Sequence, residues 1–275
     1  MFIVQAVVLG IVQGLTEFLP VSSSGHLILV PTLFGWTDQG LSYDTVLHLG
    51  TLLAVLWFFR QSLIQLVKEL FSKQPAQVEA ARTLLIQLVV CSLPALVLGF
   101  ILNDWIENVS RKPWLVVIDL AFWGLVLWRA DYVSKDRVAG AEESPTALPR
   151  ILWSQALMIA IAQPIALLPG SSRSGITMTA GLFMGLSRSA AARFSFLLSI
   201  PVTAAAGGYG LLKWITQGAD TTTPSSMLVI GFIAALLSGV FAIRFLLSYV
   251  SHRRFTPFIV YRLVLAVAVL VLLVR

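Results

Sequence analysis

Charged residues are scarce in this chain of 275 residues: they make up 12% of it, whereas 57% of the residues are apolar. A soluble domain carries about 25% charged residues. A chain with so few cannot cover this much apolar surface in water. The composition therefore excludes an ordinary soluble protein and predicts one that lies in a bilayer.

Cysteine and acidic residues are also few. The single cysteine, Cys91, excludes a disulfide framework and a cysteine metal cluster. The 13 acidic residues are outnumbered by 19 lysines and arginines, and in a membrane protein such an excess marks cytoplasmic loops rather than a nucleic-acid surface. No basic residue precedes the first apolar stretch, so no cleavable signal peptide is expected.

Six apolar stretches are long enough to cross the bilayer core, which takes about 20 helical residues. They lie near 46–59, 84–102, 114–128, 194–212, 227–247 and 258–274. With this layout most loop lysines and arginines fall on one face, which the positive-inside rule makes cytoplasmic.

Two further apolar stretches, 2–33 and 151–186, are each interrupted by a Pro/Ser/Gly cluster, LPVSSSGH in the first and LPGSSRSG in the second. A helix cannot run through either cluster, and irregular backbone at membrane depth survives only inside protein or beside a water-filled cavity. We therefore predict two re-entrant helix hairpins. The expected fold class is an all-α polytopic membrane protein with about six transmembrane helices plus these two hairpins.

The two clusters also resemble each other: 13–25 reads QGLTEFLPVSSSG and 163–175 reads QPIALLPGSSRSG. Three spans follow each hairpin, and because three is odd, the second copy must be inverted. We predict a single membrane domain, 1–275, with inverted repeats of roughly 1–130 and 151–275 joined by a cytoplasmic loop, 131–150. The hairpin loops would then meet near the midplane. The alternative is that two Ser/Gly kinks look alike by chance.

Four charged residues lie in apolar surroundings, where each costs about 2.5–3.5 kcal/mol or more unless it is compensated. Glu17 and Arg173 lie in the two clusters, one in each hairpin, so each would supply the opposite charge that the other needs. Asp119 and Arg244 lie in ordinary spans. We expect them to be structural or interfacial and assign them no catalytic role.

The first cluster carries the parts of an activated hydroxyl nucleophile or a base-assisted attack. Gln13 and Glu17 share a helical face because they are four residues apart. The polar side chains of this cluster are Gln13, Glu17, Ser22, Ser23, Ser24 and His26. The other two histidines, His48 and His252, are expected to be non-catalytic.

The second cluster is typical of an anion site. Small residues let backbone N–H groups line a concavity, and a following helix adds the positive end of its dipole. The Arg173 guanidinium matches two phosphate oxygens at once. The candidate binding residues are Gly170, Ser172, Arg173, Ser174 and Thr177. The alternative is a Ser-rich helix cap with its arginine turned towards water.

Together the two clusters closely resemble the undecaprenyl-diphosphatase family, the bacitracin-resistance membrane phosphatases. The family pattern is Glu or Gln, three residues, Glu, and later P-G-x-S-R-S-x-x-T. This chain matches every fixed position and takes the Gln option at Gln13. The resemblance extends over essentially the whole length.

The resemblance implies an enzyme of the bacterial cytoplasmic membrane, with its site opening towards the external face. Its substrate would be a polyprenyl diphosphate lipid, undecaprenyl diphosphate, cleaved to undecaprenyl phosphate and inorganic phosphate. That reaction recycles the lipid carrier of cell-wall synthesis and gives bacitracin resistance. The family implies no organic cofactor and a possible divalent cation, Mg²⁺ or Ca²⁺. Glu17 is the only acidic side chain in either cluster, which is too few for a dedicated metal cage.

In this reading Arg173, Ser172 and Ser174 hold the diphosphate, with Gln13, Ser22, Ser24, Gly170 and Thr177 as further binding residues. Ser23 is the leading nucleophile, with His26 and Glu17 as base and orienting group. His26 itself or an activated water stays open as the attacking group.

Two rival functions remain. An inverted-repeat transporter of lipid or solute would need no hydroxyl, carboxylate and imidazole opposite an arginine. The other membrane lipid-phosphatase superfamily needs a second histidine downstream of its S-R element, and after Arg173 only His252 follows.

Overall fold

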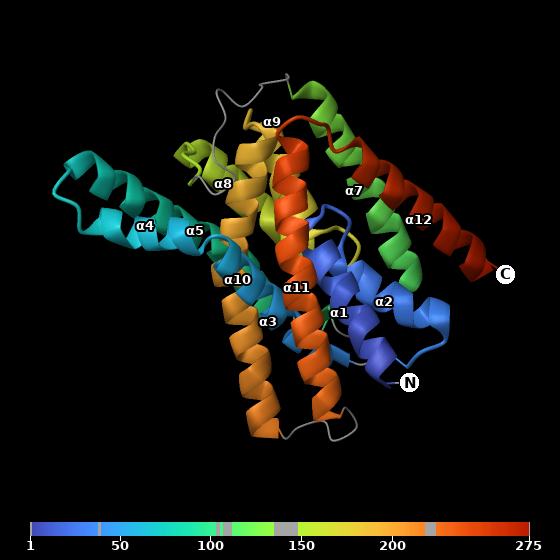
Figure 1. The fold of residues 1–275 in the computed structure, drawn as a ribbon. Coiled ribbons are helices and arrows are strands. Elements are labelled where there is room, and N and C mark those ends of the chain that lie inside the picture. The colour runs from blue at the N-terminus through green and yellow to red at the C-terminus, as the bar shows by residue number, and fades with distance from the viewer. Residues whose placement is uncertain are drawn as a thin grey trace.

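The computed structural model describes residues 2–37, 40–102, 105–106, 112–134, 148–217 and 224–274. Over these residues the chain forms eleven α-helices and one short 3-10 helix, η2, with no strand (Figure 1). The prediction of an all-α protein is confirmed.

Five helices of the described part are long and apolar enough to cross a membrane by themselves. They are α5 (Pro75–Ile101), α7 (Pro113–Val133), α10 (Arg188–Gln217), α11 (Ser225–Val250) and α12 (Thr256–Val274). The remaining predicted span is α3 (Gly40–Phe58), which is followed after a 65° bend by α4 (Arg60–Leu70). All six predicted spans are helices, and the chain is a polytopic membrane protein.

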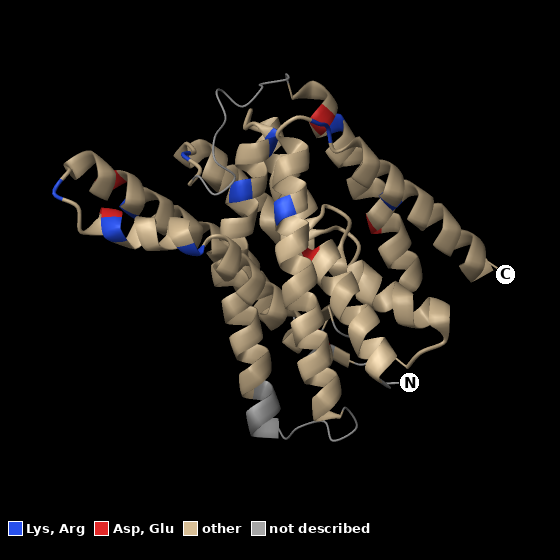
Figure 2. Ribbon diagram, viewed as in Figure 1, with Lys and Arg blue, Asp and Glu red and all other residues tan. Residues whose placement is uncertain are grey.

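Helices α4 and α5 project from one flank of the bundle, while α7 and α12 lie side by side on the other (Figure 1). Among the residues drawn in colour, Lys and Arg gather at the upper end and along the α4–α5 projection (Figure 2). The coloured lower ends of α10 and α11 carry none. This asymmetry agrees with the charge separation expected from the loops.

Both predicted helix breaks are present. Helix α1 (Phe2–Phe18) ends before the first cluster, and α2 (Ser23–Phe34) begins inside it. In the second half α8 (Trp153–Ala162) passes into η2 (Gln163–Leu167), and α9 (Arg173–Phe183) begins after the break.

The two breaks have the same backbone geometry. Ser22 and Ser172 both have a φ of 75°, and they are the only non-glycine residues with positive φ in the described part of the chain. Each serine is an N-cap whose hydroxyl accepts a hydrogen bond from the backbone N–H three residues later, Gly25 in one case and Gly175 in the other. The cap satisfies a donor that the helix leaves free and helps to offset the cost of the backbone conformation.

Helix α1 packs closely along α11 because small residues face each other across the contact. Gly10 and Gly14 lie one turn apart on α1, and Gly231 and Ala235 do the same on α11. A Cβ added at Gly10 would lie 2.5 Å from the carbonyl oxygen of Gly231. Small residues at this spacing allow the close helix approach common in membrane proteins. The packing fixes the end of α1 that carries Glu17.

Helix pairing follows a similar pattern in the two halves. Helix α1 packs on α11, and its counterparts α8 and η2 pack on α5. Helix α3 packs on its counterpart α10, and α7 packs on α12. These contacts are compatible with the predicted repeat, which stays a prediction. The repeat boundaries and the sides from which the hairpins enter stay predictions, and most of the connecting loop, 135–147, lies outside the described residues.

Candidate active site

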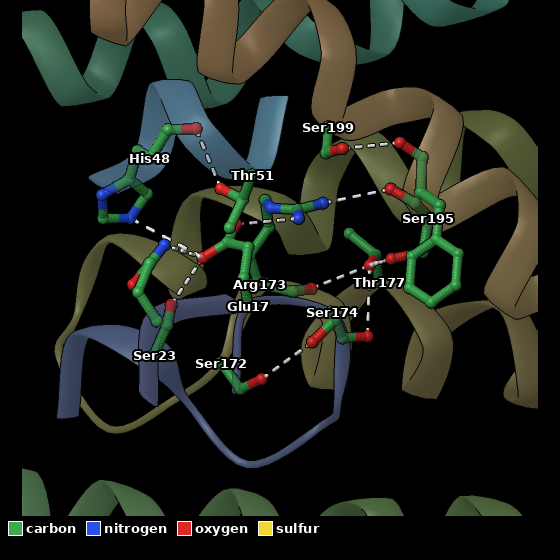
Figure 3. Close-up of polar contacts among 12 residues, drawn as sticks. Glu17, Ser23, His48, Thr51, Ser172, Arg173, Ser174, Thr177, Ser195 and Ser199 are labelled. Atoms are coloured by element: carbon green, nitrogen blue, oxygen red, sulfur yellow. Dashed lines mark hydrogen bonds and ion pairs between the residues drawn. The ribbon is translucent and has the colours of Figure 1, made fainter. Parts of the chain in front are cut away.

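The Glu17 carboxylate is the point at which the two helix breaks meet. It lies in the last turn of α1 and is 7% exposed. Its Oε1 accepts a hydrogen bond from Arg173 Nη2 at 3.1 Å, and its Oε2 accepts from Ser23 Oγ at 2.6 Å and Gln13 Nε2 at 3.1 Å (Figure 3). The prediction that the opposite charges of the hairpins compensate each other is confirmed.

Arg173 is held on two sides. It is the first residue of α9, and its Nη1 donates to the carbonyl oxygen of Ser195 in α10 at 3.0 Å (Figure 3). Its side chain is only 13% exposed. The alternative of an arginine turned towards water is therefore wrong, and the guanidinium instead lies fixed beside the carboxylate.

The remaining polar groups of the second cluster bind the loops to each other and to α10. Ser174 Oγ donates to the carbonyl oxygen of Leu19 at 3.0 Å. Thr177 Oγ1 lies 2.7 Å from Ser195 Oγ and donates to the carbonyl oxygen of Arg173 (Figure 3). Ser172 Oγ lies 3.2 Å from Ser174 Oγ. The predicted role of these hydroxyls in binding substrate stays a prediction, since each already has a partner within the protein.

Ser22 links the two breaks directly, because its hydroxyl accepts from the backbone N–H of Gly170 at 3.1 Å. A Cβ at Gly170 would lie 2.6 Å from the carbonyl oxygen of Val116, so only glycine fits there. Ser24 Oγ is 3.4 Å from Ser22 Oγ. These residues shape the junction, whereas Ser23 is the serine that contacts Glu17.

Arg262 of α12 hydrogen-bonds to both loops. The sequence analysis did not identify this residue. It is fully buried, and its guanidinium donates to five backbone carbonyls at 2.9–3.2 Å. These belong to Pro20, Leu120, Asp119, Gly170 and Ser171. The signal was present in the sequence, because Arg262 is a charged residue in an apolar span, as Asp119 and Arg244 are.

His26 lies close by but is engaged elsewhere. Its Nδ1 is 2.7 Å from the carbonyl oxygen of Ser22, and its Nε2 is 2.7 Å from the Tyr261 hydroxyl, against whose ring it stacks. A carbonyl oxygen only accepts, so Nδ1 carries a hydrogen, and in the neutral ring Nε2 accepts from Tyr261. Neither nitrogen hydrogen-bonds to Ser23 or Glu17. The role of His26 as base or nucleophile stays a prediction. In the structure, His26 links α2 to α12 through its contact with Tyr261.

His48, which the sequence left outside the site, lies beside it. The Nε2 atom of His48 is 3.6 Å from Glu17 Oε2. The Thr51 hydroxyl donates to the backbone carbonyl oxygen of His48 (Figure 3). No motif marks this histidine, and only the packing of α3 on α1 places it here. Of the other two charged residues expected in spans, Asp119 is half-buried on α7 and Arg244 is exposed on α11.

The side chains do not form a metal cage. Among the described residues no group of three or more His, Cys, Asp or Glu lies close enough to hold an ion. Both oxygens of Glu17 already bind protein donors, including a guanidinium. The structure identifies no metal ligand, and the divalent cation stays a prediction.

This arrangement places a hydroxyl, a carboxylate that accepts its hydrogen bond and a cation suited to phosphate in one buried site. It defines a polytopic membrane protein with a polar reaction site where two broken helices meet. Residues 6–268 match the family model described as bacitracin resistance protein BacA. The chain belongs to this family.

Individual relatives agree over the full length. The chain is 41% identical over 273 residues to undecaprenyl-diphosphatase 2 of Stutzerimonas stutzeri (strain A1501), covering 99% of this chain and 98% of that protein. It is 44% identical over 272 residues to the undecaprenyl-diphosphatase of Pelotomaculum thermopropionicum (strain DSM 13744 / JCM 10971 / SI), covering 99% and 97%. It is 38% identical over 274 residues to undecaprenyl-diphosphatase 1 of Pseudoalteromonas translucida (strain TAC 125), covering 99% of each.

Proposed function

We propose that this protein hydrolyses undecaprenyl diphosphate to undecaprenyl phosphate and inorganic phosphate. The names of its full-length relatives support this reaction. The observation that carries it is the Glu17 carboxylate, which binds a hydroxyl through one oxygen and a guanidinium through the other. A protein that only transports its ligand has no need of this pairing.

Arg173 binds the terminal phosphate in this mechanism. Two helix N-termini, those of α2 and α9, begin at the residues that contact Glu17, and helix N-termini favour anions. Because Arg173 and Ser23 bind different oxygens of one carboxylate, a phosphate held by the guanidinium lies next to the serine hydroxyl. The site thereby holds the reacting atoms together, which is the main contribution a protein makes to phosphoryl transfer.

Glu17 acts as the base. As Ser23 Oγ forms its bond to the terminal phosphorus, its proton passes to Glu17 Oε2, and the bridging P–O bond breaks with its electrons on the lipid phosphate. A water then attacks the phosphoserine: the P–Oγ bond breaks, Glu17 returns its proton to Ser23 Oγ and takes one from the water, and inorganic phosphate is released. In the alternative, Glu17 activates a water that attacks the lipid diphosphate directly. A divalent cation would enter with the phosphates, since the residues that the structure describes supply no cage of their own.

Phosphate release from the purified protein tests this function. The wild type should release inorganic phosphate from undecaprenyl diphosphate in detergent, and Glu17→Gln should not. Arg244→Gln, exposed on α11, is the matched control for loss of a charge in a span. A wild-type protein that binds the lipid but releases no phosphate would favour the transporter.

We propose that the protein lies in the cytoplasmic membrane with its lysine- and arginine-rich end in the cytoplasm (Figure 2), and that its site opens to the external side, as the family resemblance implies. Single cysteines at two exposed positions test this orientation in a Cys91→Ala background. Thr37→Cys, after α2, should react with an impermeant thiol reagent in intact cells. His252→Cys, after α11, should react only once the membrane is opened. The opposite pattern would invert the orientation.

A further inference from the structure

His48 connects the buried carboxylate of the site with its surroundings. Its side chain is 31% exposed, whereas Glu17 is 7% exposed. The other side chains that contact Glu17 include Arg173 at 13% and Gln13 at 0%. Of the side chains of His48, Arg173 and Gln13, that of His48 is therefore the most exposed at the surface of the protein.

The ring of His48 is held in a defined orientation. Its Nδ1 lies 2.7 Å from the carbonyl oxygen of Asp44, one turn earlier in α3. Since that oxygen accepts and cannot donate, Nδ1 carries a hydrogen. In the neutral ring the lone pair is then on Nε2, the atom that lies 3.6 Å from Glu17 Oε2. This is also the oxygen to which Ser23 donates (Figure 3).

The two histidines near the breaks therefore differ in what they offer. The Nε2 of His26 accepts from Tyr261, and the side chain of His26 is buried. The Nε2 of His48 faces the carboxylate at the centre of the site. Among the described residues, His48 is the one that places a basic nitrogen next to a proton on Glu17.

We propose that His48 carries the proton from Glu17 to solvent in each turnover, a role that rests on the proposed hydrolysis. The attacking hydroxyl, whether of Ser23 or of water, gives its proton to Glu17 Oε2 and leaves the carboxyl neutral. His48 Nε2 takes this proton once the two atoms close to hydrogen-bond distance, about 2.6–3.2 Å. The imidazolium then gives the Nε2 proton to water or buffer, while Nδ1–H keeps its hydrogen bond to the carbonyl oxygen of Asp44. Glu17 is again a carboxylate beside Arg173.

His48→Ala tests the relay through its dependence on small proton acceptors. At low buffer concentration we expect kcat to fall by roughly a hundredfold, the lower end of the range of about 10²–10⁴ that proton transfer by a positioned side chain contributes. KM should stay within about twofold, since Arg173 still holds the substrate. Added imidazole should restore activity in a saturable way, because the side chain that it replaces is partly exposed.

Two histidine variants are the controls. His252→Ala, exposed in the turn after α11, should keep normal activity and show no response to imidazole. His26→Ala should lose activity that imidazole does not restore, because its ring is buried and fixes α2 to α12. His48→Gln retains a polar side chain and serves as the second variant if His48→Ala does not fold.

The outcomes separate this proposal from the hydrolysis itself. If the wild type releases no phosphate, the proposed function fails. If the wild type is active and His48→Ala or His48→Gln matches it at low buffer, the relay is overturned. A folded His48→Ala protein whose loss of activity imidazole does not relieve also overturns it, because His48 would then have a structural role.

Discussion

The two helix breaks have the same backbone and different chemistry. Each begins a new helix after an N-cap serine with a φ of 75°, Ser22 in the first and Ser172 in the second. The residue that follows each cap is the first of its helix: Ser23 in one break and Arg173 in the other. Both of these side chains hydrogen-bond to Glu17. One fold element thus occurs twice, and its equivalent position holds the hydroxyl in one copy and, in the other, the cation that we propose binds phosphate.

The residues before the breaks have diverged as well. Gln13 donates to Glu17, whereas its counterpart Gln163 donates to the carbonyl oxygen of Cys91 in α5. The position that corresponds to Glu17 is Leu167 in η2. Only the first break carries a carboxylate, and the arginine of the second break finds its charged partner there rather than in its own half. Neither half therefore forms the site alone, because Glu17 and Ser23 come from the first half and Arg173 from the second.

Replacing the carboxylate should have the largest effect. Glu17→Gln keeps the shape but cannot take the proton of Ser23, and it leaves Arg173 without its ion pair. Phosphate release should fall by roughly a thousandfold. Leu167→Met, at the equivalent position, is the control and should stay near wild type. Turnover of Glu17→Gln within a few fold of wild type would show that the carboxylate is not the base.

Ser23→Ala should have the next largest effect, roughly a hundredfold in phosphate release. A non-hydrolysable diphosphate analogue should still bind, because Arg173 remains. The double variant with Glu17→Gln should cost little more than Glu17→Gln alone, since the two groups act as a unit. Ser24→Ala is the control, because Ser24 Oγ approaches Ser22 rather than Glu17. Normal turnover of Ser23→Ala would show that water, rather than Ser23, is the attacking group.

Arg173→Lys should lower activity by about tenfold, which corresponds to about 1.4 kcal/mol of transition-state stabilisation. Lysine keeps the charge but lacks the planar fork that reaches both Glu17 and the carbonyl oxygen of Ser195. Kinetics with undecaprenyl diphosphate measure this effect, with Arg244→Lys as the exposed control. Near-normal activity of a folded Arg173→Lys protein would show that the reaction does not need the planar guanidinium.

Arg262→Lys should have the smallest effect on the reaction and a clear effect on the fold. Arg262 supports both breaks, since it donates to Pro20 in the first and to Gly170 and Ser171 in the second. Lysine would leave some of these buried carbonyls unpaired, at a cost of about 1–3 kcal/mol. Thermal unfolding in detergent should occur at a lower temperature, while turnover of the folded fraction falls by less than about tenfold. Arg253→Lys is the exposed control. An unchanged unfolding temperature would contradict the role of Arg262.

The sequence by itself determined which segments are helices and where two of them break. Apolar length predicts the six spans because the bilayer sets the length of a crossing helix, and Pro, Ser and Gly predict the breaks because they end helices locally. The pairing of Glu17 with Arg173 was also predictable, since two buried opposite charges in otherwise apolar sequence compensate each other best in contact.

Only the tertiary structure decided which other side chains join them. His48 reaches Glu17 because α3 packs on α1, and Arg262 reaches both loops because α12 packs beside α7. His26, which the sequence grouped with Ser23 and Glu17, instead pairs with Tyr261. Local sequence fixes where a residue lies on its own helix. The neighbour that a side chain meets depends on helices distant in the chain, because helix packing sets those contacts and local sequence does not.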